Sequence, residues 1–209
     1  RHRGAARGGA EAGGVGTDGD DDVIGFAAVL EPRVDEAGAV GLADEGLAER
    51  VEYVLDDYRS ISGRYDVFVS VGMLEHVGRR DYPALGDVID RCLKPGGRGL
   101  IHTIGRVRPG PMNAWIERRI FPGAYPPSLK EMMDIFEPYR LSVLDVENLR
   151  LHYARTLEHW LERFENNRES IRVMMDEAFV RAWRLYLAGS IAAFQVGELQ
   201  LYQVVFTRS

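Results

Sequence analysis

A carboxylate stands just past a short apolar segment in the middle of the chain. The segment Tyr65–Val69 is rich in β-branched and aromatic residues, which is typical of a buried parallel strand. It leads into the turn Ser70–Gly72, and Glu75 follows that turn. Open α/β sheets bind ligands at the carboxyl ends of their strands, so an acid at this position is a candidate for acid–base chemistry. The alternative, an exposed acid that begins a helix, fits the position equally well.

A histidine occupies a similar position on another segment. Leu100–Ile104 has the composition of a second strand, and His102 lies near its carboxyl end. Between the two strands, Asp81–Leu93 places apolar residues at three- and four-residue spacing, which predicts an amphipathic helix that ends at Lys94–Gly97. A single histidine in a strand is more often structural than catalytic, so the pattern by itself favours a structural role for His102.

An acidic turn follows a further predicted strand. Val51–Leu55 alternates apolar and polar side chains, as a strand with one covered face does. Asp56–Arg59, with the sequence Asp-Asp-Tyr-Arg, comes at the carboxyl end of this strand. An ordinary surface turn explains these residues, and a ligand-binding role is the alternative.

Three segments together resemble one enzyme family. Tyr65–Gly78 (YDVFVSVGMLEHVG), Leu93–Gly105 (LKPGGRGLIHTIG) and Leu199–Phe206 (LQLYQVVF) are similar to motifs of the cyclopropane-fatty-acyl-phospholipid synthases, with the motif order preserved from about Gly46 onward. The resemblance implies an S-adenosylmethionine-dependent methyltransferase that adds a methylene group to the double bond of an unsaturated acyl chain in a phospholipid. It also implies an α/β fold, namely a class I, Rossmann-like methyltransferase sheet with helices on both faces.

The same resemblance implies roles for individual residues. In this family the new methyl group loses a proton to a bound bicarbonate ion. The residues implied to hold that ion are Glu75, His102, the backbone of Ile104, and Tyr153. The residues implied to bind S-adenosylmethionine are Asp57, Tyr58, Arg59, Val71 and Gly72. No residue spacing in the sequence predicts a metal site.

The C-terminal half supplies candidate walls for an acyl chain. Arg106–Pro127 is longer than a normal connection and rich in Pro, Gly and Arg, which indicates a substrate loop whose arginines contact anionic headgroups or lie on a solvated face. The capping-box pattern Ser128–Glu131 predicts the start of a helix, and Leu141–Val146 predicts a strand. Tyr153–Phe164 and Phe179–Phe194 are predicted amphipathic helices, and their aromatic side chains form core or line an acyl-chain channel.

Composition limits the partners and the location. The net charge of −6 argues against a nucleic-acid partner, and no apolar run is long enough to cross a bilayer or to act as a signal peptide. Cys92 is the only cysteine, which fits a reducing compartment, and its place on an apolar helix face predicts burial. Together with a lipid substrate, this predicts a cytoplasmic protein, peripheral to the inner face of the membrane, whose partner is an unsaturated phospholipid. A homo-oligomer is compatible with the sequence.

The first forty residues do not fit the family pattern. Residues 1–22 are mainly Gly, Ala, Arg and Asp and are predicted to be disordered, and the GxGxxG match within Gly14–Gly19 lacks the preceding strand that this motif needs. Val23–Leu30 is a candidate strand. We expect residues 1–40 to be a non-homologous segment, read out of frame from a GC-rich gene. We expect residues 41–209 to be the C-terminal part of a methyltransferase catalytic domain.

Two family features have no counterpart in this sequence. The glycine-rich loop D-x-G-C-G-W-G-G, which contacts the cofactor, is missing, and Cys92 does not match the pocket cysteine of the family. We therefore expect at most weak methyltransferase activity, and an unpaired edge on the strand that begins at Tyr65. Two alternatives stay open. One is a non-catalytic lipid- or partner-binding remnant of the family, and the other is a lipid C-methyltransferase that does not close the ring.

Overall fold

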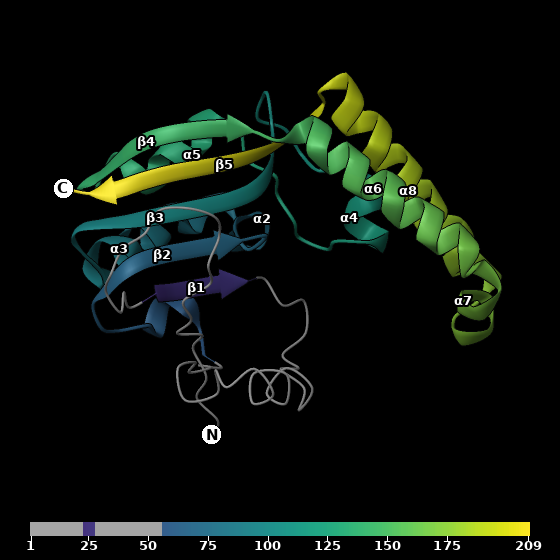
Figure 1. The fold of residues 1–209 in the computed structure, drawn as a ribbon, viewed down its shortest axis with the longest axis horizontal. Helices are drawn as coiled ribbons and strands as arrows, with labels where there is room; N and C mark the ends of the chain where they lie inside the picture. The colour runs from purple at the N-terminus through teal and green to yellow at the C-terminus, as the bar shows by residue number, and fades with distance from the viewer. Residues whose placement is uncertain (1–22, 28–55) are drawn as a thin grey trace.

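Five strands of the computed structural model form one mixed sheet. The structure describes residues 23–27 and 56–209. The strand order is β1-β2-β3-β5-β4; β1, β2 and β3 are parallel, and β5 runs antiparallel to both of its neighbours (Figure 1). The α/β class predicted from the sequence is confirmed. The strands are β1 (Val23–Ala27), β2 (Tyr65–Val71), β3 (Leu93–Arg106), β4 (Leu141–Asn148) and β5 (Leu199–Arg208).

The predicted strands that fall on described residues are present, but β3 is longer than expected. It begins at Leu93, directly after the preceding helix, so the predicted turn at Lys94–Gly97 lies inside the strand. The reason is a bulge: the pairing of β2 with β3 passes from Tyr65↔Leu93 directly to Val67↔Arg98. The extra residues of β3 loop out between these two pairs, where Gly96 has a positive φ of 77°.

A short strand covers the outer edge of β2. β1 lies within the predicted segment Val23–Leu30 and pairs in parallel with β2, from Val23↔Val67 to Ala27↔Val71. The expectation that this edge of β2 is unpaired is therefore wrong. The predictions for residues 1–22 and Val51–Leu55, and the boundary at residue 40, lie outside the described residues.

Two helices build the main core against the sheet. α3 (Tyr82–Cys92) carries the apolar stripe that the sequence predicts, and α5 (Leu129–Phe136) begins at the predicted capping box and also buries one face. The capping box of α5 is present, since Ser128 and Glu131 exchange side-chain-to-backbone hydrogen bonds. Cys92 is buried in this core, as predicted. The fully buried side chains shared by helices and strands include Phe68, Leu85, Ile89, Ile101, Met132, Ile135, Phe136, Val204 and Phe206.

Three helices form an arm, Arg150–Val196, that extends away from the sheet. α6 (Arg150–Asn166) and α8 (Glu177–Val196) lie side by side, and α7 (Arg168–Met174) joins them at the far end (Figure 1). The predicted helices at Tyr153–Phe164 and Phe179–Phe194 are confirmed. α7 was not predicted because it buries no residue and so shows no apolar period. A second core holds α6 and α8 together, with Leu157, Phe164, Val180, Leu187 and Phe194 among its members.

The remaining helices are short and lie in the connections. α2 (Leu74–Val77) follows β2, and α4 (Ala114–Arg119) lies within the long segment after β3. Two 3-10 turns, η2 (Tyr58–Ser60) and η3 (Arg79–Asp81), flank β2 and α2. The carboxyl ends of β1, β2 and β3 point toward the arm (Figure 1), so the end of the sheet that usually binds ligands faces these helices.

Two helical glycines give a matched test of the α3–α5 packing. A Cβ at Gly86 in α3 would lie 2.4 Å from the carbonyl oxygen of Ile135 in α5, whereas a Cβ at Gly189 in α8 would meet nothing within 4 Å. We expect Gly86→Ala to lower the free energy of unfolding by about 1–3 kcal/mol, because the helices must separate. Gly189→Ala should raise it by about 0.5–1 kcal/mol. Urea denaturation of both variants checks this, and a neutral Gly86→Ala would contradict the close approach.

Candidate active site

Glu75 reaches the carboxyl end of the sheet through a tight turn after β2. The strand ends at Val71, and Gly72 turns the chain with a φ of 65°, where a side chain would be strained. α2 then places Glu75 in its first turn, where the side chain is buried with 7% of its surface exposed. The acid is therefore not the exposed helix-starting residue that the alternative interpretation requires.

The Glu75 carboxylate completes the backbone pairing of β3. The last paired residues of β2 and β3 are Val71 and His102, and the Gly72 N–H donates to the His102 carbonyl at 2.9 Å. β3 continues beyond this point, and the Ile104 N–H donates to Oε1 of Glu75 at 2.6 Å. Oε2 of Glu75 is buried and has no hydrogen-bond partner among the described residues. A buried carboxylate oxygen without a donor is costly, so Oε2 marks a place where a ligand can donate a hydrogen bond.

A large cavity opens beside this carboxylate. Its volume is about 940 Å³, and Glu75, His102, Ile104 and Tyr153 all line it. The structure thus brings together the four residues that the sequence analysis placed in the catalytic group. They come from α2, β3 and α6, which are distant in sequence. The roles of these residues remain predictions, whereas their common location is a feature of the fold.

Tyr153 is held as a neutral hydroxyl at the cavity wall. Burial, with the nearby Tyr186 and the Glu75 carboxylate, raises the pKa of Tyr153 to about 12. The ring packs edge-on against Phe194 with the centroids 5.0 Å apart, which fixes its orientation. Near neutral pH this phenol keeps its proton, so it can donate a hydrogen bond to an anionic or polar ligand.

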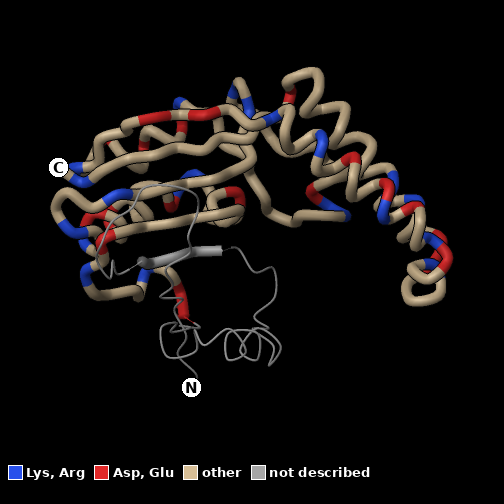
Figure 2. The backbone as a smooth tube through the Cα atoms, in the orientation of Figure 1, with Lys and Arg blue, Asp and Glu red and all other residues tan. Residues whose placement is uncertain are grey.

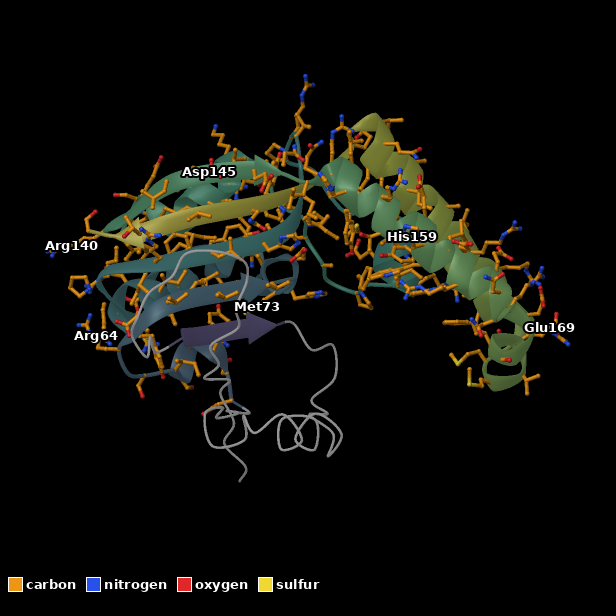
Figure 3. The ribbon with its side chains drawn as sticks, viewed as in Figure 1. Arg64, Met73, Arg140, Asp145, His159 and Glu169 are labelled. Atoms are coloured by element: carbon orange, nitrogen blue, oxygen red, sulfur yellow. The ribbon has the colours of Figure 1, made fainter. Side chains whose placement is uncertain are left out.

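The rest of the cavity wall is mainly apolar. The predicted substrate loop contributes one side of it and α8 contributes the other. Met73, just before α2, lies at the end of the sheet that faces the arm, while His159 lies on the arm itself (Figure 3). The apolar and aromatic lining residues include Met112, Trp115, Ile116, Phe121, Trp160, Trp183, Tyr186, Phe194 and Leu201. Such a cavity, mainly apolar with a few polar groups in its wall, fits a hydrocarbon chain.

The predicted cofactor-binding residues fall into two groups. Val71 and Gly72 line the cavity, but Asp57, Tyr58 and Arg59 are not among its lining residues. The Asp57 carboxylate is engaged by the Arg59 side chain at 2.6 Å and 2.9 Å, and hydrogen bonds from Arg59 lower the pKa of Asp57 to about 2. Both side chains of this pair are about half exposed.

Several further polar or aromatic residues of the cavity did not emerge from the sequence. His76 follows Glu75 and meets Phe121 edge-on at 6.2 Å, and Ser190 and Glu198 also line the cavity. Glu198 lies directly before β5, which runs opposite to its neighbours, so its amino end lies where the parallel strands have their carboxyl ends. Knowledge of that strand direction would have pointed to Glu198. Trp115 in α4 gave no signal beyond the length of its loop.

A buried glutamate fixes the loop that covers Glu75. Glu131 accepts hydrogen bonds from the Tyr125 hydroxyl at 2.8 Å, from the Ser128 N–H at 2.9 Å, and from the Ser128 hydroxyl at 2.8 Å. Nη1 of Arg79 lies 3.4 Å from Oε1 of Glu131 and forms an ion pair with it. The Tyr125 N–H in turn donates to the carbonyl of Glu75 at 2.7 Å. Burial raises the pKa of Glu131, but these hydrogen bonds and Arg79 outweigh burial, and the pKa lies below its usual value.

Two further properties of the described residues concern metal ligands and membrane spans. They contain no group of three or more His, Cys, Asp or Glu side chains placed to hold a metal ion. Among the same residues, no helix combines the length and apolar character needed to cross a bilayer.

Glu131→Gln tests this loop network. An amide cannot accept all of these hydrogen bonds, so we expect a loss of about 1–3 kcal/mol of unfolding free energy at pH 7. Because the folded pKa of Glu131 is depressed, its contribution is full above the ordinary pKa of 4.5 and disappears as the pH falls through the lower folded value. The difference between wild type and variant should therefore close in acid. Glu137→Gln, at an exposed position just after the same helix, is the control. A pH-independent difference would contradict the network.

Comparison with known proteins identifies the family. The family model described as mycolic acid cyclopropane synthetase matches residues 28–204. Tuberculostearic acid methyltransferase of Mycobacterium tuberculosis is 38% identical over 174 residues, which cover 80% of this chain and 41% of that protein. Cyclopropane-fatty-acyl-phospholipid synthase of Escherichia coli K12 is 38% identical over 159 residues, covering 76% of this chain and 41% of that protein. The chain thus spans less than half the length of these relatives.

Solved structures show the same fold. The cyclopropane synthase MmaA2 from Mycobacterium tuberculosis superposes with a TM-score of 0.69 at 24% identity, covering 74% of this chain and 59% of that chain. The mycolic acid cyclopropane synthase CmaA1 complexed with SAH and CTAB gives a TM-score of 0.69 at 26% identity with the same coverage. The predicted methyltransferase-type α/β fold is confirmed, and the chain belongs to the mycolic acid cyclopropane synthetase family.

Proposed function

We propose that this site serves S-adenosylmethionine-dependent transfer of a methylene group to the double bond of an unsaturated acyl chain in a phospholipid, forming a cyclopropane ring. The observation that carries the proposal is the buried Glu75 carboxylate, with one free oxygen, beside a long apolar cavity. Relatives are named for this reaction class, among them the synthase of Escherichia coli and a probable fatty acid methyltransferase of Pseudomonas putida, 35% identical to this chain. Residues 41–209 would then be part of a methyltransferase catalytic domain.

The apolar walls of the cavity hold the acyl chain and exclude water. S-adenosylmethionine supplies an electrophilic methyl group when it is bound. Val71 and Gly72 at the end of β2 are the described cavity residues that fit its side of the site, because a Cβ at Gly72 would meet nothing within 4 Å. Asp57, Tyr58 and Arg59 remain proposed contacts for its adenine end. Positive charge on the hydrocarbon is tolerated only in a dry site with fixed polar groups, and Glu75 with Tyr153 supplies such groups.

The polar groups of the cavity also fit a bicarbonate ion, which supplies a base when it is bound. The unpartnered Oε2 of Glu75 can accept the hydroxyl proton of the ion. The protonated Tyr153 can donate to the anion, and His102 is placed to do the same. The Ile104 N–H already donates to Glu75, so we propose that Ile104 acts by orienting that carboxylate.

A second candidate function is methyl transfer without ring closure. It is favoured by the tuberculostearic acid methyltransferase, which is as similar to this chain as the cyclopropane synthase is. Both reactions add one CH2 to the acyl chain overall, since a methyl group is gained and a proton is lost. An alkene product without a ring still carries a double bond. Ozone cleavage of the product lipids therefore separates the two functions.

Glu75→Gln tests the proposed role of the carboxylate. The purified chain is incubated with methyl-labelled S-adenosylmethionine and vesicles of unsaturated phospholipid, and label in the lipid is counted. We expect the variant to lose about a hundredfold or more of the incorporation, because it removes a group used in proton transfer. Glu137→Gln should retain the wild-type value. Equal incorporation in wild type and Glu75→Gln would contradict the role, and no incorporation in the folded wild type would favour the non-catalytic alternative.

The affinity for S-adenosylmethionine tests the missing glycine-rich loop. Losing two good hydrogen bonds, at about 1–1.5 kcal/mol each, weakens binding about thirty- to a hundredfold. We expect calorimetric titration of the 209-residue chain to give a dissociation constant weaker than the low-micromolar range. Low-micromolar affinity would show that other residues replace the loop.

A further inference from the structure

The far end of the arm carries three consecutive apolar side chains that pack against nothing in the core. Val173, Met174 and Met175, called the tip below, are 82%, 73% and 57% exposed. They lie at the end of α7, outside the core that joins α6 to α8. Glu169, also in α7, lies at the end of the arm farthest from the sheet (Figure 3). Apolar side chains gathered on a convex protrusion are costly in water and mark an interaction site.

An aromatic row connects the tip with the cavity. Phe179 begins the row just after the tip and stacks on Trp183, with the ring centroids 5.9 Å apart. Trp183 contacts Tyr186 at 5.1 Å, and Tyr186 contacts Phe121 at 5.7 Å. Trp183, Tyr186 and Phe121 all line the cavity. The rings thus form a continuous row from the first turn of α8 to the cavity.

The charge of this side of the molecule differs from that of the whole chain. Residues 106–119, which supply part of the cavity wall, hold four arginines and one glutamate, and the arm holds seven arginines and six acidic residues. Together these segments carry eleven positive and seven negative charges, a net charge of +4 within a chain whose net charge is −6. Basic residues alternate with acidic ones along the arm up to its end (Figure 2), and several of them form ion pairs. This side of the molecule is thus suited to an anionic surface.

We propose that the tip inserts into the interface of an anionic phospholipid bilayer and that the arm guides an acyl chain from the bilayer to the cavity. The proposal rests on the proposed function, since that function gives the cavity a lipid as its substrate. Three side chains on a convex end are too few for a protein interface of ordinary size, which buries about 800 Å² on each partner. Shallow insertion of a few apolar side chains is how peripheral proteins hold a membrane surface, and the net positive charge of the arm together with residues 106–119 adds attraction to anionic lipid.

Vesicle binding by matched variants tests the tip. Val173→Glu/Met174→Glu places charges in the proposed insertion site, and Val196→Glu makes the same change at the other end of α8, where Val196 is 76% exposed. In co-sedimentation with vesicles of phosphatidylglycerol and unsaturated phosphatidylethanolamine, we expect wild type and Val196→Glu to bind alike. The affinity of the tip variant for the vesicles should fall by about tenfold or more, because two apolar side chains no longer leave water. Equal binding of the tip variant, or no binding of wild type, would overturn the proposal.

A fluorescent label gives a second reading that does not depend on the stability of the double variant. Cys92 is the only cysteine and is buried, so Met174→Cys and Val196→Cys each add one accessible thiol. An environment-sensitive dye on residue 174 should shift to shorter wavelength with anionic vesicles, and the same dye on residue 196 should not. A shift at residue 174 without vesicles, lost on dilution, would assign the tip to contact between copies of the chain and overturn the proposal.

The two proposals fail in different ways. If the tip variant transfers methyl groups into vesicle lipids as fast as wild type, the proposed membrane insertion of the tip is overturned and the proposed function stands. If vesicle binding depends on the tip but the chain transfers no methyl group, the proposed membrane insertion stands and the proposed function is overturned.

Discussion

The site depends on one hydrogen bond, from the Ile104 N–H to Oε1 of Glu75. β2 stops pairing at Val71 while β3 continues, so a backbone donor on β3 would be left without a partner inside the protein. Glu75 satisfies this donor and is oriented by it. The same bond leaves Oε2 buried and without a partner among the described residues, in a residue that lines the cavity. The need to satisfy a backbone N–H beyond the carboxyl end of β2 thus fixes the orientation of the Glu75 carboxylate, to which the chemistry is assigned.

The directions of β4 and β5 explain why the arm begins and ends beside this group. β4 is antiparallel to β5 and therefore parallel to the other strands, so it also ends at the edge where Glu75 lies. The chain leaves β4 into α6 and returns from α8 into β5 at this edge. Arg150 anchors the base of the arm through the carbonyl of Phe194 at 2.8 Å, and the Leu149 N–H donates to Leu201 at 2.8 Å. The arm is a long insertion between two paired strands, which gives the cavity its apolar wall.

Local patterns predicted most of the fold because each element buries one face. The apolar stripe of α3, the capping box of α5 and the strand at Tyr65 all follow from such patterns. α7 was not predicted because it buries no residue. The bulge in β3 was not predicted because it depends on the register between β3 and β2. The partner of β1 is likewise a long-range property that its five residues do not encode alone.

The candidate site could be predicted in part. Glu75 follows from its place just after a strand, whereas the roles of His102 and of Tyr153 on a distant helix came only from the family resemblance. The network around Glu131 appears in sequence merely as a capping box, because its links to Tyr125 and Arg79 form only in the folded chain. Asp57 and Arg59 match the family pattern, yet the structure pairs them with each other outside the cavity lining.

The central claim is that an acyl chain lies in the cavity with its double bond at Glu75. A phospholipid that carries a diazirine in place of the double bond tests it most directly, because the carbene formed by light inserts into whatever lies beside that carbon. Mass spectrometry of the irradiated complex should place the label on the peptides that contain Glu75 and Tyr153. Label found only on residues outside the cavity would contradict the account.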